Sequence, residues 1–123
     1  MAMTRVERAR ELQDRTKKFA LRIIRAFSRL PKTEEARVLG RQFLRSGTSV
    51  AANYRAACRA RSAADFISKI SVVTEETDET LFWLELVVEA KLVRAENLVP
   101  LIMECEELLK IFSASLATAK GNR

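Results

Sequence analysis

The stretch that determines how this chain folds is LPKTEE, residues 30–35. Pro31 cannot continue a helical hydrogen-bond ladder, so a helix that arrives from the N-terminal side ends before it. Thr33 is a good N-cap, and Glu34 and Glu35 then lie in the first turn of a new helix, where the helix dipole favours negative charge. So short a break predicts two helices that lie side by side and run in opposite directions.

Helical periodicity extends outward from this turn on both sides, because apolar residues recur three or four positions apart. They predict a first helix over about 5–30 and a second over about 34–60. Gly40 and Gly47 inside the second helix each cost about 1 kcal/mol relative to alanine, so they need a structural reason, either close helix approach or a bend in the helix. The inward-facing residues are Leu12, Phe19, Ala20, Ile23, Phe27 and Leu30 in the first helix, and Val38, Leu39, Phe43, Leu44 and Val50 in the second.

The second half of the chain predicts two more helices. Ser62 and Asp65 resemble a capping box that opens a third helix, over about 63–92. Asn97 is the expected N-cap of a fourth helix, over about 97–119, with Pro100 at its third position, where the N–H needs no partner. The inward residues of the third helix are Phe66, Ile70, Val73, Thr77, Leu81, Leu84 and Val88. Four long helices with short links predict a single domain over 1–123, an all-α antiparallel up-down-up-down four-helix bundle.

Composition narrows the classes of function. The 123 residues include no histidine, which removes the usual general base and the commonest metal ligand, so we expect no catalytic residues, no metal site and no cofactor. No apolar run approaches the roughly 20 residues of a membrane span, and residues 1–13 do not resemble a signal peptide. We therefore expect a cytoplasmic protein without a membrane partner, in which Cys58 and Cys105 stay reduced.

Charge is divided between the two halves of the chain. Residues 1–61 hold 16 basic and 5 acidic side chains, a formal charge of +11, whereas residues 62–123 hold 6 basic and 11 acidic side chains, a formal charge of −5. Such a division can attract a polyanion, dock the chain on copies of itself, or do both.

The first helix carries arginines at intervals of seven residues, and the second adds arginines at intervals of four. Seven residues are nearly two helical turns, so we expect one basic stripe opposite the apolar face. Three interpretations remain open: a solvated face with ion pairs such as Glu7 or Glu11 to Arg15, contact with phosphate, and pairing with the acidic half of another copy. Aromatic residues are scarce, so nucleic-acid binding would be directed at the backbone and sensitive to salt. The candidate nucleic-acid-binding residues are Arg8, Arg15, Lys18, Arg22, Arg25, Arg29, Arg37 and Arg41.

The third predicted helix combines an apolar segment with a group of acids. Residues 81–88 are apolar on more than one face, so we expect Phe82, Trp83 and Leu86 to contact another chain. Among the acids at 75, 76, 78 and 79, we expect one or two to turn toward Ser49, Asn53 or an arginine of the second helix. A paired polar network of that kind fixes helix register.

Five stretches resemble, in this order, the four-helix bundle proteins associated with intervening sequences of bacterial 23S ribosomal RNA. They are FALRII at 19–24, LPKT at 30–33, RSGTSVAANYRA at 45–56, ADFISK at 64–69 and ETDETLFWL at 76–84. The resemblance covers about residues 17–95, and the fourth helix contributes only its apolar pattern.

The resemblance implies an antiparallel bundle that assembles into a homopentameric ring, has no established catalytic activity and binds RNA or DNA. More distantly, the chain is similar to the accessory protein of diversity-generating retroelements, which works with a reverse transcriptase and its template RNA. The family pattern transfers Ser49, Asn53, Glu76 and Glu79 as polar positions that are either structural or functional. The expected function is thus a non-enzymatic, self-assembling bundle that binds nucleic acid. The alternative is a protein-protein scaffold or accessory subunit without direct nucleic-acid contact.

Overall fold

The computed structural model describes residues 2–121, which form four helices and no strand. The helices are α1 (Arg5–Ser28), α2 (Glu34–Ala57), α3 (Ala63–Glu89) and α4 (Ala95–Ala119). The prediction of an all-α chain with four helices is therefore confirmed. The ends of the predicted domain, residue 1 and residues 122–123, lie outside the described part of the chain.

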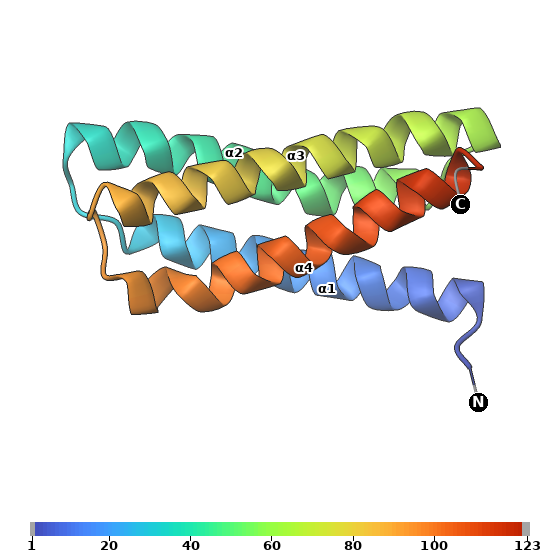
Figure 1. The fold of residues 1–123 in the computed structure, drawn as a ribbon, viewed down its shortest axis with the longest axis horizontal. Helices are drawn as coiled ribbons and strands as arrows, with labels where there is room; N and C mark the ends of the chain where they lie inside the picture. The colour runs from blue at the N-terminus through green and yellow to red at the C-terminus, as the bar shows by residue number, and fades with distance from the viewer. Residues whose placement is uncertain (1, 122–123) are drawn as a thin grey trace.

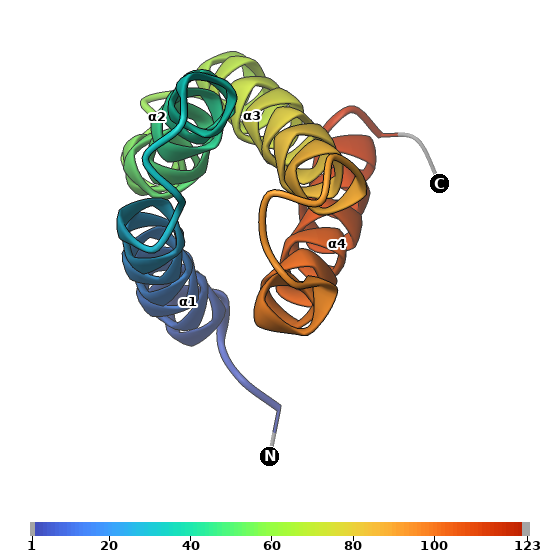
Figure 2. The same ribbon diagram turned by 90° about the vertical axis from the view of Figure 1, so that its left-hand side faces the viewer.

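The helices follow one another around a common core. The α1–α2 and α3–α4 turns lie at one end of the molecule, while the α2–α3 turn, the start of α1 and the end of α4 lie at the other (Figure 1). Seen end-on, each helix lies beside the next one in the chain (Figure 2). The α1–α4 contact is much smaller than the α1–α2, α2–α3 and α3–α4 contacts. The basic helices α1 and α2 are therefore neighbours over a long seam.

The predicted starts of α2 and α3 are confirmed. The Thr33 hydroxyl accepts the backbone N–H of Ala36 at 3.3 Å, and the Ser62 hydroxyl accepts that of Asp65 at 3.0 Å. The Asp65 carboxylate, however, accepts the backbone N–H of Arg61 at 3.1 Å and does not return to Ser62. Each cap satisfies N–H groups that a helix start leaves without a partner.

The prediction that Asn97 caps the fourth helix is wrong. The helix begins at Ala95, after Arg94, whose side chain makes no capping hydrogen bond. Leu98 is buried together with the residues three and seven positions later, so the chain must already be helical at Leu98 to direct it into the core. Pro100 then occupies the sixth helical position instead of the third.

The first three helices end two or three residues earlier than predicted. The clearest stop follows α3, where Lys91 has a left-handed backbone with φ of 59°. The N–H groups of Lys91 and Leu92 donate to the carbonyls of Val88 and Val87, at 2.9 and 3.2 Å. This is a Schellman motif with lysine in the place that glycine usually takes.

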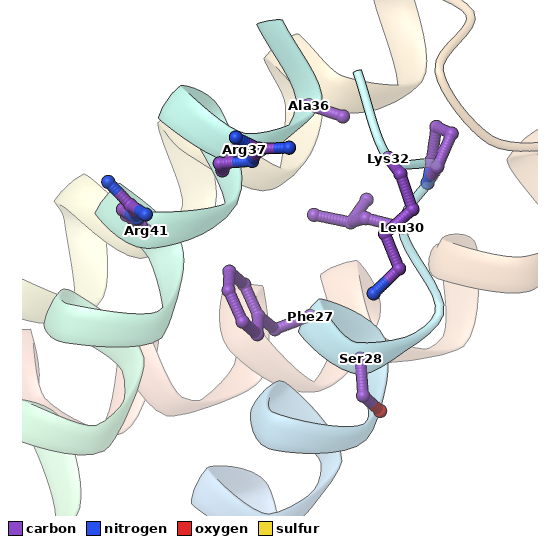
Figure 3. Close-up of a pocket in the computed structure, with 8 residues that line it drawn as sticks. Phe27, Ser28, Leu30, Lys32, Ala36, Arg37 and Arg41 are labelled. Carbon is purple, nitrogen blue, oxygen red and sulfur yellow. The ribbon is translucent and has the colours of Figure 1, made fainter. Parts of the chain in front are cut away.

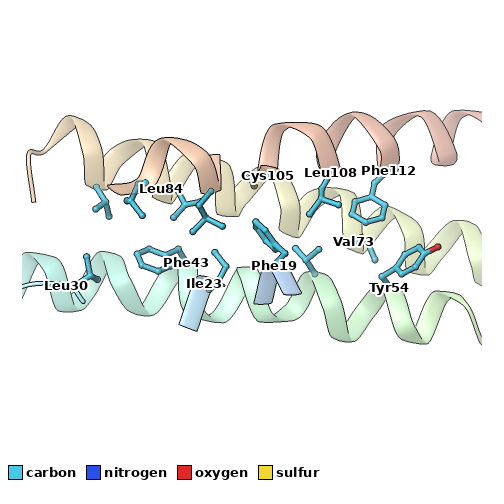
Figure 4. Close-up of a cluster of buried hydrophobic side chains, with 14 of the residues drawn as sticks. Phe19, Ile23, Leu30, Phe43, Tyr54, Val73, Leu84, Cys105, Leu108 and Phe112 are labelled. Atoms are coloured by element: carbon cyan, nitrogen blue, oxygen red, sulfur yellow. The ribbon is translucent and has the colours of Figure 1, made fainter. Parts of the chain in front are cut away.

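One hydrophobic core draws on all four helices (Figure 4). Its largest fully buried side chains include Phe19, Phe43, Leu84 and Phe112. In α3 the predicted inward register is confirmed at 70, 73, 77 and 84, whereas the residues at 66, 81 and 88 are half-buried. The core fixes which faces of α1 and α2 remain outside.

The two helical glycines lie at the α1–α2 seam, as expected. A Cβ atom on Gly47 would lie 2.7 Å from Cγ1 of Ile23, and one on Gly40 would lie 2.5 Å from Cδ1 of Leu30. Side chains of α1 therefore rest directly on the backbone of α2.

None of the helices in residues 2–121 is long and apolar enough to cross a membrane. The two cysteines are free: Cys105 is buried and Cys58 is half-buried. Cys105 donates from its thiol to the carbonyl of Thr77 at 3.4 Å, inside the core.

Candidate nucleic-acid interface

Six of the eight candidate cations lie at the surface of α1 and α2. The same two helices pack against each other, so these side chains lie on neighbouring helices. The exposed cations are Arg8, Lys18, Arg25 and Arg29 on α1, with Arg37 and Arg41 on α2.

The row of arginines at intervals of seven residues on α1 was predicted to lie opposite the apolar face. In the structure it does not. Arg15 and Arg22 are half-buried, because the row begins on the flank of α1 that faces α4. Seven residues at about 100° each fall roughly 20° short of two full turns, so each step moves the row around the helix. The row therefore winds from the α4 side toward solvent.

Arg15 is held by Glu104 of α4. Its Nε donates to Oε2 at 2.8 Å and its Nη2 donates to Oε1 at 2.7 Å, a two-pronged pair. The hydrogen bond with Glu104 raises the pKa of Arg15. The pairing with Glu7 or Glu11 that spacing on one helix suggested is not formed, since the partner is 89 residues away in the chain.

Arg45 joins α2 to α3 through two carboxylates. Its Nη1 lies 3.1 Å from Oε2 of Glu76, and its Nη2 lies 2.7 Å from Oε2 of Glu79. Hydrogen bonding to Glu79 and the charge of Glu76 raise the pKa of Arg45. The expectation that acids of the third helix turn toward an arginine of the second is confirmed.

The other candidate cations form no ion pair within residues 2–121. Within residues 2–121, carboxylates lie within 4.0 Å of only three basic side chains: Arg15, Arg45 and Lys69. Seven of the eight candidates therefore have no carboxylate partner in the described part of the chain. An arginine without an internal partner presents all its donors to whatever approaches the surface.

The apolar side chains proposed for contact with another chain lie on the outer part of α3. Phe82 is 54% exposed, and its ring meets that of Trp83 edge-on, with centroids 5.0 Å apart. Trp83 and Leu86 are half-buried. The indole N–H of Trp83 is buried and has no hydrogen-bond acceptor in the described residues. Their contact with another chain stays a prediction.

In the described residues, no group of three or more cysteine and acidic side chains is arranged to hold a metal ion. The acids of α3 that pair with Arg45 are instead the partners of a cation from the same chain.

Comparison with known proteins identifies the family. The family model described as 23S rRNA-intervening sequence protein matches residues 9–114. The chain belongs to this family. Among solved structures, it is similar to a protein of unknown function from the S23 ribosomal protein family of Bacteroides thetaiotaomicron. The two are 34% identical with a TM-score of 0.79, and the match covers 85% of this chain and 96% of that one. A comparison with curated proteins gave no match.

The four polar positions that the family resemblance singled out do not form one site. The Asn53 amide donates to the carbonyl of Ser49 at 2.9 Å and to its hydroxyl at 2.7 Å, within α2. Glu76 and Glu79 instead hold Arg45. In this member of the 23S rRNA-intervening sequence protein family, both pairs thus make internal contacts that tie α2 to itself and to α3.

Sequence reasoning missed two contributors to this surface. Glu104 neutralises Arg15, and no local spacing reveals it, because the pair forms only after α1 and α4 meet. Arg45 appeared as the third member of an arginine series, but it turns to α3 because each four-residue step rotates the side chain further around α2.

Proposed function

We propose that this member of the 23S rRNA-intervening sequence protein family is a non-enzymatic, self-assembling bundle that binds RNA or DNA through the phosphate backbone. One observation carries the proposal: seven of the eight candidate cations have no carboxylate partner in residues 2–121, and they lie on or directly after two adjacent helices. Phosphate suits such arginines, since the guanidinium fork matches its oxygens.

The finer architecture belongs to the same proposal. The antiparallel up-down-up-down bundle assembles into a homopentameric ring in the cytoplasm, with the face of Phe82, Trp83 and Leu86 at the interface between copies. The exposed ring of Phe82 supports this, because exposed apolar groups on a monomer mark contact sites. The ring places several copies of the basic face around one nucleic acid, which raises its effective affinity.

Binding through phosphates predicts a steep salt dependence. The test measures fluorescence anisotropy of an RNA stem-loop and of a duplex DNA between about 50 and 200 mM salt. In the triple variant Lys18→Gln/Arg25→Gln/Arg29→Gln we expect weaker binding and a log-log salt slope that is shallower by about 2 to 3.

The matched control is Lys91→Gln/Arg94→Gln/Lys110→Gln, which removes the same charge from exposed positions of the α3–α4 turn and of α4. Its slope should stay close to that of the unmodified protein. Equal losses in both triple variants would show that only net charge matters, and absence of any RNA or DNA binding at low salt would refute the proposal.

The second candidate is a protein-protein scaffold or an accessory subunit, for example of a reverse transcriptase, without direct nucleic-acid contact. The exposed apolar residues of α3, Val72 and Phe82, favour it. Light scattering at low and high salt separates two kinds of assembly, because opposite charges dissociate in salt whereas an apolar contact persists.

A further inference from the structure

A pocket of about 250 Å³ opens where α1 turns into α2, at the junction of the two basic helices (Figure 3). Phe27, Leu30 and Ala36 form its apolar part, and Lys32, Arg37 and Arg41 also line it. Figure 3 shows Phe27 and Leu30 between the end of α1 and the part of α2 that carries the two arginines. It is thus a small apolar cavity bordered by three cations.

The packing of the α1–α2 seam holds the aromatic ring of this pocket in place. Phe27 packs edge-on against the buried ring of Phe43, with centroids 6.5 Å apart. The ring also lies against Gly40, where a Cβ would be 3.0 Å from Cδ1 of Phe27. Because both contacts are with rigid groups, the ring is preorganised and needs little ordering when a ligand arrives.

All the charged side chains that line the pocket are positive. No carboxylate lies within 4.0 Å of Lys32, Arg37 or Arg41 among residues 2–121. Glu34 and Glu35 are close in sequence, but neither lines the pocket. Arg37 and Arg41 are one helical turn apart on α2, so they point the same way and can hold one anionic group between them.

From this arrangement we infer that the pocket takes one unpaired nucleotide of a bound strand. Its base stacks on Phe27 and Leu30, and its phosphate lies between Arg37, Arg41 and Lys32. The inference rests on the proposed function and adds to it a specific site for an extruded or terminal base. Ligand pockets that enclose a whole small molecule measure roughly 300 to 1,000 Å³, so this smaller one suits a single residue of a longer strand.

The experiment compares two RNAs, a fully paired stem-loop and the same stem-loop with one unpaired 2-aminopurine. Stacking of one base on an aromatic side chain changes affinity about 5- to 150-fold, so we expect the unmodified protein to prefer the second RNA by a factor in that range. The emission of 2-aminopurine should change on binding, because the base leaves its neighbours for the pocket.

Two variants, each with a control, test whether the preference for the RNA with the unpaired base arises in the pocket. Ser28→Tyr places a large ring at the edge of the pocket without changing charge, and Ser68→Tyr places the same ring on an exposed position of α3 that is not part of this pocket. Ser28→Tyr should bring the two RNAs to equal affinity, and Ser68→Tyr should not. Arg37→Gln/Arg41→Gln should reduce the preference more than Arg55→Gln/Arg59→Gln at the other end of α2.

The outcomes separate the two proposals. Equal binding of both RNAs by the unmodified protein overturns the pocket inference and leaves the proposed function standing. A preference that survives in Ser28→Tyr overturns it too, because the unpaired base would then bind elsewhere. Failure to bind either RNA overturns both.

Discussion

Gly47 sets the distance between α1 and α2. A Cβ there would lie within 2.9 Å of three side-chain carbons of Ile23, a residue with no exposed surface. Overpacking of this kind costs about 1 to 3 kcal/mol, and the better helix propensity of alanine returns up to about 1 kcal/mol. We predict that Gly47→Ala lowers the free energy of unfolding by about 1 to 2 kcal/mol in urea denaturation.

Gly40→Ala is the matched comparison. Its nearest contact is a terminal methyl of Leu30, which lies next to the turn and is 9% exposed, so it can move aside. The ring carbons of Phe27, at 3.0 and 3.1 Å, need to shift by only a few tenths of an ångström. The loss of stability should be the smaller of the two, below about 1 kcal/mol. A Gly47→Ala protein as stable as the unmodified one would contradict the close seam.

The buried thiol of Cys105 makes the free energy of unfolding depend on pH in the alkaline range. Burial raises the pKa of its thiol from 9.0 to about 12, and nearby carboxylates add to the effect. The folded state holds this proton more tightly than the unfolded state, so the contribution to stability is complete below about pH 9 and is lost as pH rises toward 12. Burial raises the pKa of Tyr54 as well, which acts in the same direction.

We therefore predict that the free energy of unfolding falls between pH 9 and 10 more steeply in the unmodified protein than in Cys105→Ala. The expected difference is about 1 kcal/mol per pH unit, since one pKa unit corresponds to about 1.4 kcal/mol. Cavity formation in Cys105→Ala lowers stability at every pH and leaves the slope unaffected. Parallel pH profiles would show that the thiol keeps its ordinary pKa.

At the scale of the helix, α3 is followed closely by a residue whose backbone conformation is unfavourable for its side-chain type. Lys91 adopts φ of 59°, a conformation that costs a residue with a Cβ about 1 to 2 kcal/mol, whereas glycine adopts it freely. We predict that Lys91→Gly raises the free energy of unfolding by up to about 1 kcal/mol in urea denaturation. Ala90→Gly is the control, because Ala90 has φ of −77° and glycine there should destabilise.

Helix starts could be predicted from the sequence where a side chain makes the cap. Thr33 and Ser62 carry hydroxyls that accept a backbone N–H, and both were found correctly. The start of α4 could not be found in this way, because Arg94 contributes no capping side chain and the burial of Leu98 decides the boundary. Local signals predict a helix end only when tertiary packing does not compete with them.

The cations of the candidate site show the same limit. Their positions follow from helical periodicity, and six of the eight are exposed as a stripe requires. Helical periodicity does not predict which of these cations form ion pairs, since Arg15 pairs with Glu104 of a helix distant in sequence. The pocket beside Phe27 was equally invisible, because it needs the turn and both helices in place.

At the scale of the whole molecule, the two halves of the chain form opposite sides with different chemistry. The α1–α2 side carries the seven candidate cations without a carboxylate partner, and α3 carries Phe82 near acids of which two pair with Arg45. We predict that Phe82→Ser dissociates the assembly in size-exclusion chromatography with light scattering. Each buried phenylalanine contributes about 1.5 to 3 kcal/mol to such a contact.

Met103→Ser is the control for this prediction. Met103 is 62% exposed, lies on α4 and is not one of the residues of the predicted interface. Its replacement should leave the molar mass unchanged. A monomeric unmodified protein at micromolar concentration, or equal dissociation in both variants, would contradict the assembly through α3.

The first two turns of α1 pack against almost nothing. From Arg5 to Glu11 only Ala9 is even half-buried, and a capping box between Thr4 and Glu7 keeps this end helical. At 1.5 Å per residue the segment is about 10 Å long, and it ends level with the other helices without packing closely on them (Figure 1). Because this end of α1 is exposed around most of its circumference, a partner can contact Arg5, Arg8 and Arg10 from more directions than it can contact the cations of the packed turns.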